Sequence, residues 1–99
     1  MPIRIRRASR NVFKDLGFKE TAADNLRIRA TLMARIRRMI DRRGLTQDAA
    51  ARLLGVSQPR VSDLVRGRIE RFSIDILVTM LSRAGLHVRV VVSSGSQVA

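Results

Sequence analysis

The feature that most constrains the fold is the stretch LTQDAAARLLGVSQPRVSDLVRG, which covers residues 45–67. Its pattern predicts two short helices, over residues 47–54 and 58–66, separated by a turn that contains Gly55. Two helices joined by so short a turn can cross at a wide angle only if small side chains lie where their backbones meet. Ala51 in the first helix meets this requirement. The stretch therefore predicts two helices that pack across each other.

The second helix of this pair carries apolar side chains at Val61 and Leu64, which would pack against the first helix. Together with Ala51 and Gly55, their spacing resembles the helix-turn-helix of phage repressors and of the Xre family of regulators. The resemblance covers about residues 26–84. It implies a mainly α, lambda-repressor-like DNA-binding domain, in which the second helix of the motif enters the major groove.

Burial of Val61 and Leu64 would turn a row of polar side chains outward, on a helix narrow enough for the major groove. Gln58 can pair with an adenine edge, and Arg60 can pair with guanine N7 and O6. The alternative is that this row is an ordinary solvated helix surface. The residues from which we expect base contacts are Gln58, Pro59, Arg60 and Asp63.

Phosphate contacts are expected around this helix rather than at its centre. In the repressors that this sequence resembles, the glutamine that opens the first helix of the motif touches the DNA backbone, which implies the same role for Gln47. Hydroxyl groups can donate to phosphate, and arginines on the loop after the second helix would lie near the duplex. The residues from which we expect phosphate contacts are Gln47, Ser57, Ser62, Arg68 and Arg71.

The charge of the chain also points to a polyanionic partner. Twenty lysine and arginine residues against 8 aspartate and glutamate residues give a formal net charge of +12. Nucleic acid is the commonest partner of so basic a protein. Recognition of single-stranded RNA through stacked bases needs presented aromatic side chains, whereas the aromatic residues here are Phe13, Phe18 and Phe72, each in an apolar context. Double-stranded DNA is therefore the expected partner.

The segments on both sides of the motif also have helical patterns. From about Thr21, apolar residues recur every three or four positions until Gly44, and a further helix, capped by Ser73, ends at Gly85. The apolar stripe of the first of these helices comprises Leu26, Ala30, Met33, Ile36 and Ile40. The division expected along the chain is a basic arm over residues 1–19, the helix-turn-helix domain over 20–85, a strand over 86–92 and a flexible tail over 93–99.

The stretch LHVRVVV alternates in the manner of a β-strand, and a lone strand cannot satisfy its own backbone hydrogen bonds. We expect two chains to pair these strands across a two-fold axis and form a homodimer. Two recognition helices would then lie roughly 34 Å apart, so the operator would be an inverted repeat. The alternative is an intrachain hairpin with residues 3–5, and both pairings together would give a four-stranded sheet. The expected dimerisation residues are Leu86, Val88, Val90 and Val92.

The order of these elements, preceded by the segment NVFKDLGF, looks like the small Xre-type antitoxins, HigA-like proteins in particular. This resemblance implies repression of the protein's own operon and binding of a ribonuclease toxin. Such toxins are basic, so a segment that faces the toxin would be expected to be acidic. Residues 1–19 instead hold six basic residues and one acidic residue. A mainly toxin-binding function is therefore kept as the alternative. The basic arm could enter a minor groove or be mobile. Val12, Phe13 and Leu16 would form a staple on the core or a docking patch.

Catalysis finds little support in the sequence. There is no cysteine, and the single histidine, His87, has no evident carboxylate cluster beside it. We therefore expect no enzyme activity, no metal and no cofactor. The absence of cysteine suits a reducing cytoplasm, and no segment has the apolar length of a signal peptide or a membrane span. The expected location is the cytoplasm.

Overall fold

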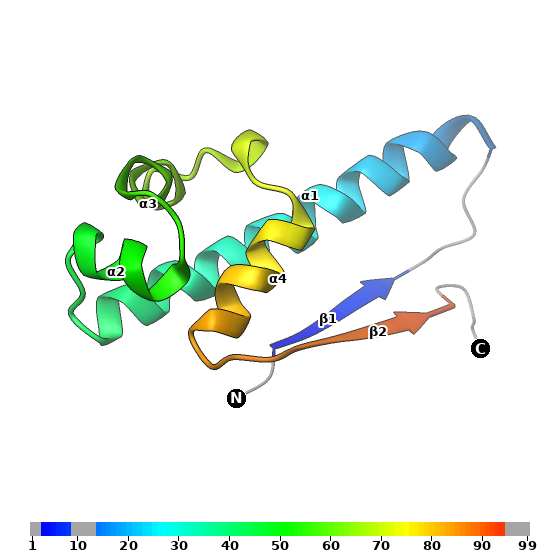
Figure 1. Ribbon diagram of the computed structural model, residues 1–99. Coiled ribbons are helices and arrows are strands. Elements are labelled where there is room, and N and C mark those ends of the chain that lie inside the picture. The colour runs from blue at the N-terminus through cyan, green and yellow to red at the C-terminus, as the bar shows by residue number, and fades with distance from the viewer. Residues whose placement is uncertain (1–2, 9–13, 95–99) are drawn as a thin grey trace.

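The computed structural model describes the backbone of residues 3–8 and 14–94 and the side chains of residues 21–94. A long helix carries the shorter helical elements along part of its length, and a two-stranded sheet lies beside them (Figure 1). The elements in chain order are β1 (Ile3–Ala8), α1 (Lys14–Arg42), α2 (Gln47–Leu54), α3 (Gln58–Val65), the 3-10 helix η1 (Ile69–Arg71), α4 (Ile74–Arg83) and β2 (Val88–Ser93). This order confirms the predicted mainly α fold with a helix-turn-helix and a C-terminal strand.

Local sequence fixes where α2, α3 and α4 begin. Thr46, Ser57 and Ser73 each accept a hydrogen bond from the backbone N–H three residues ahead, at 3.1, 3.4 and 3.2 Å. Gly55 ends α2 with φ at 72°, in the left-handed region that glycine adopts without strain. The predicted starts of these helices and the predicted glycine stop are confirmed, and they define the turn between α2 and α3.

The core lies between α1 and the shorter helices. The inner side of α3 contributes Val61 and Leu64, which are 0% and 2% exposed. Because interior side chains pack at high density, these two residues fix the rotation of α3 about its own axis. The buried apolar residues are Leu32, Met33, Ile36, Met39, Ile40, Ala50, Ala51, Leu54, Val61, Leu64, Phe72, Leu77, Met80, Leu81, Ala84 and Leu86.

The N-terminal half of α1 differs from the prediction. The helix begins at Lys14, within the segment predicted to be an irregular basic arm, and it includes Gly17. A glycine inside a helix costs only about 1 kcal/mol relative to alanine, so it does not end this one. The prediction that Leu26 faces the core is wrong, because α1 extends beyond the shorter helices (Figure 1) and this side chain is 46% exposed. Ala30, one turn further on, is also exposed.

Within the chain, β2 pairs with β1, and the two strands are parallel. The register sets Ile3 opposite Val88 and Ile5 opposite Val90. The hairpin considered as the intrachain pairing is therefore wrong. The whole helical domain separates the two strands, and a crossover of that length allows them to run in the same direction. Each strand of a two-stranded sheet keeps one unpaired edge, so pairing of β2 with a second chain stays a prediction.

Several expectations concern residues that the structure does not describe. Val12, Phe13 and residues 95–99 lie outside the described residues, as does the side chain of Leu16. The staple, the insertion of the arm into a minor groove and the binding of a toxin therefore stay predictions. Ser93 is the last residue of β2, so the prediction that the tail begins at this residue is wrong. None of the helices in the described part of the chain combines the length and the hydropathy that a membrane span requires.

Candidate nucleic-acid interface

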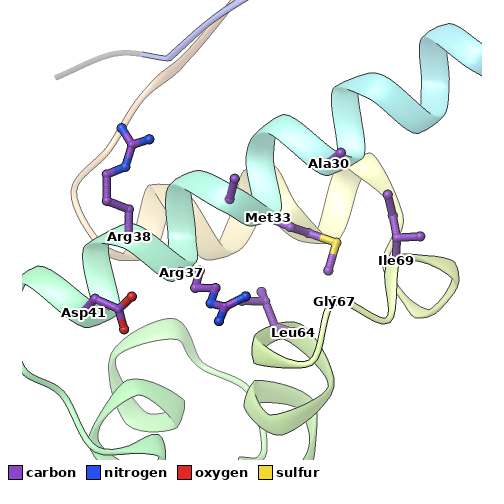
Figure 2. A pocket seen from close by; sticks show the side chains of 9 residues that line it. Ala30, Met33, Arg37, Arg38, Asp41, Leu64, Gly67 and Ile69 are labelled. Carbon is purple, nitrogen blue, oxygen red and sulfur yellow. The ribbon is translucent and has the colours of Figure 1, made fainter.

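The two sides of α3 differ in polarity and in exposure. Leu64 points toward α1, on the same side as Arg37 (Figure 2), and Val61 is completely buried. Gln58 and Pro59, in the first turn of α3, are exposed. The predicted inward direction of the two apolar side chains is confirmed. The first turn of the helix is left open to a ligand.

Arg60 lies against the segment that follows α3. Its Nη1 donates a hydrogen bond to the carbonyl oxygen of Arg71 at 2.8 Å, and its guanidinium carbon lies 4.3 Å from the centre of the Phe72 ring. An arginine at that distance from an aromatic face gains a cation–π attraction. Phe72 is itself buried, so it offers a fixed platform. Arg60 is therefore half-buried and held in place, with the remaining guanidinium N–H groups available as donors.

Asp63 joins two of the arginines predicted to contact phosphate. Its Oδ2 accepts a hydrogen bond from Arg71 Nη1 at 3.3 Å, and its Oδ1 lies 4.0 Å from Arg68 Nε. The Asp63 side chain is 18% exposed, against 50% for Arg71 and 40% for Arg68. Asp63, predicted to contact a base, thus forms one cluster with Arg68 and Arg71, predicted to contact phosphate. The carboxylate is the most buried group of the three.

The loop that carries these arginines is also held from the side of α1. Arg29 Nη1 donates to the carbonyl oxygen of Ile69 at 3.1 Å and to that of Phe72 at 3.5 Å. Backbone carbonyls paired in this way stabilise an otherwise irregular segment. The sequence does not reveal Arg29 and Phe72 as site residues, because both act on residues far away along the chain. Arg29 and Arg60 together position the loop next to α3.

The other predicted phosphate contacts lie at the starts of α2 and α3. Ser57, the N-cap of α3, is exposed, whereas Gln47 in the first turn of α2 and Ser62 in α3 are half-buried. The first N–H groups of a helix have no partner within the helix and attract anions. A phosphate that approached these helix starts would therefore meet backbone donors as well as side chains.

The predicted dimerisation residues divide into two pairs. Leu86 is buried against the helical core and Val88 is half-buried. Val90 and Val92 are 65% and 77% exposed, although both are apolar. The outer part of β2 therefore presents an apolar surface, whereas Leu86 belongs to the core of a single chain.

The described residues contain no group of three histidine, cysteine, aspartate or glutamate side chains that could hold a metal ion. His87 is exposed. The chemistry present on α3 and on the following loop is that of hydrogen-bond donors and positive charge, which suits recognition of a polyanion.

Comparisons with known proteins agree with this geometry. A family model described as "Helix-turn-helix domain" matches residues 12–93. A solved structure named "Putative XRE Family Transcriptional Regulator" is 34% identical, with a TM-score of 0.71, and the match covers 79% of this chain and 90% of that one. The comparison with curated proteins found no match. The chain belongs to the Xre-like helix-turn-helix family of DNA-binding transcriptional regulators.

Proposed function

We propose that this protein is a sequence-specific repressor that reads double-stranded DNA with α3 in the major groove. The observation that supports this most strongly is the rotation of α3, whose apolar side is buried while its first turn is exposed. A helix so placed can enter the major groove without rearrangement of the fold. Transcriptional regulation is also what the name of the similar solved structure states for that protein.

Base reading is proposed for the start of α3. Gln58 is exposed and can pair bidentately with an adenine edge, and the exposed ring of Pro59 can contact a thymine methyl group. Arg60 can reach a guanine with the donors that it does not use on Arg71. Each good bidentate pair discriminates against a wrong base by roughly 1–3 kcal/mol.

Phosphate contacts are proposed for Gln47, Ser57, Ser62, Arg68 and Arg71, which surround the start of α3 and continue onto the loop behind it. Asp63 lies between Arg68 and Arg71 and restrains both guanidinium groups. If about six phosphates are neutralised, affinity should fall by roughly a thousandfold between 50 and 200 mM salt.

Dimerisation is proposed through β2. One edge of this strand pairs with β1, so the other edge can pair with the same strand of a second chain across a two-fold axis. The exposed side chains of Val90 and Val92 would lose contact with water in such a dimer. Two copies of α3 would then face an inverted-repeat operator.

The test is binding to DNA from upstream of the protein's own gene and to a scrambled duplex, followed by fluorescence anisotropy. We expect the wild type to prefer the first duplex, and Gln58→Ala to reduce that preference by about tenfold. The control is Thr79→Ala, at an exposed position of α4, which should leave the preference unchanged. Equal wild-type affinity for the two duplexes, or an unaffected preference in Gln58→Ala, would contradict base reading by α3.

A further inference from the structure

A second concentration of positive charge lies on the side of α1 that faces away from α3. Arg38 extends from α1 on the side opposite to Arg37 and Leu64 (Figure 2). Beside it is a pocket of about 390 Å³ at the junction between α1 and the segment that leads into β2. The described residues that line this pocket are Arg35, Arg38, Met39, Arg42, Arg43 and Leu86.

Three of the four arginines that line this pocket lack acceptors among the residues whose side chains are described. Arg43 Nη2 donates to the carbonyl oxygen of Ala84 at 3.3 Å. Arg35, Arg38 and Arg42 form no hydrogen bond or ion pair with the residues whose side chains are described. The Nε of Arg35 is buried without any hydrogen-bond partner. A buried donor without an acceptor destabilises the folded state, so an acceptor brought within reach of this side chain would restore a missing interaction.

The positive charge of the residues that line the pocket also favours the binding of an anion. Four guanidinium groups line it, and none of the lining residues is acidic. Like charges held close together repel each other, and that repulsion is relieved when a multivalent anion binds among them. Met39 and Leu86 are buried and add an apolar surface to the same pocket.

We propose that this pocket is a binding site for a small oligophosphate, such as the phosphate chain of a nucleotide. The planar guanidinium group donates two parallel hydrogen bonds to a phosphate, which makes arginine the residue best suited to that group. The volume falls within the range of roughly 300–1,000 Å³ that is usual for small-ligand sites. The apolar surface of Met39 and Leu86 would contact the part of the ligand that carries no phosphate.

The proposed ligand site does not overlap the proposed DNA surface. None of the described residues that line it is one for which a DNA contact is proposed, and the end of the Arg38 side chain extends away from Leu64 (Figure 2). A bound oligophosphate and an operator could therefore occupy one protein at the same time. The ligand site does not depend on the proposed function of α3, because it shares no residue with it.

The experiment is isothermal titration calorimetry of the full chain with inorganic tripolyphosphate at fixed ionic strength. The test variant is Arg35→Gln/Arg38→Gln/Arg42→Gln, and the control is Arg37→Gln/Arg52→Gln/Arg83→Gln, which removes the same charge from exposed positions outside this pocket and outside the proposed phosphate contacts. We expect the test variant to lose at least about tenfold in affinity for tripolyphosphate, since the loss of one charge-assisted hydrogen bond accounts for about that factor. The control variant should bind it as the wild type does.

Three outcomes would overturn the proposal. The first is an equal loss of tripolyphosphate affinity in both triple variants, which would mean general attraction by net charge. The second is a hexaglutamate peptide that binds the wild type as tightly as tripolyphosphate does. The third outcome is measured on Arg35→Lys, which keeps the positive charge but removes the planar pair of donors. This variant also provides a test if the triple variant does not fold. Unchanged tripolyphosphate affinity in this variant would exclude the assigned role of Arg35.

Discussion

Asp63 allows a sharp test of how α3 and the following loop cooperate. The sequence predicts that this carboxylate accepts a hydrogen bond from a base, whereas the structure shows it 3.3 Å from Arg71 and 4.0 Å from Arg68. The substitution Asp63→Asn keeps the size of the side chain and removes its charge. The two assignments predict opposite changes in DNA binding, so a single variant separates them.

The magnitude follows from the two ion pairs. Both arginines are 40% or more exposed, so each pair is screened and contributes roughly 0.2–1 kcal/mol. We therefore expect Asp63→Asn to lower the free energy of unfolding by about 1 kcal/mol, which lowers Tm by about 4–8 °C in a domain of this size. A carboxylate about 8 Å from a phosphate repels it by roughly 0.5 kcal/mol in water. Its removal should raise affinity for scrambled DNA by about twofold.

The assay is fluorescence anisotropy with the upstream duplex and the scrambled duplex, alongside thermal unfolding by circular dichroism. The control is Asp41→Asn, which removes one negative charge from an exposed position of α1 rather than from α3 or its loop. If Asp63 restrains Arg68 and Arg71, affinity rises for both duplexes and Tm falls. A loss of upstream affinity by about tenfold, with scrambled DNA unaffected, would refute this reasoning and support base reading by the carboxylate.

Three further predictions concern the turn, the loop and the strand. Gly55→Ala and Gly44→Ala should each destabilise the fold by about 1 kcal/mol because both glycines have positive φ. The two losses of Tm should be nearly equal, since the Cβ added at Gly55 would meet only the exposed, flexible end of the Arg83 side chain, which can move aside, and a much larger loss for Gly55→Ala would contradict this. Arg71→Ala should reduce the salt slope of operator binding by about 1, and an unchanged slope would exclude a phosphate contact. Val90→Asp, at a side chain that is 65% exposed, should dissociate the proposed dimer while the chain stays folded, as judged by sedimentation velocity and circular dichroism.

The helix-turn-helix could be predicted in detail because its determinants are local. Thr46 and Ser57 cap the two helices through backbone groups three residues away, and Gly55 adopts the left-handed conformation that the turn requires. The inward direction of Val61 and Leu64 follows from helical periodicity, and the remaining positions of α3 are exposed or half-buried.

The parts that could not be predicted depend on contacts between distant segments. The pairing of Arg60 with Phe72 and the grouping of Asp63 with Arg71 form only when the loop folds back along α3. The parallel mate of β2 lies at the other end of the chain. The exposure of Leu26 depends on where the shorter helices end along α1, which periodicity within α1 does not reveal.

The absence of cysteine permits a direct test of the claim that the outer side of α3 faces DNA. A single cysteine introduced as Arg66→Cys, at the exposed end of α3, can carry a DNA-cleaving reagent, and Arg42→Cys carries the same reagent on the far side of α1. We expect strand cleavage within the bound site from position 66 and none from position 42. Cleavage from position 42 alone would contradict the orientation on which the proposed function depends.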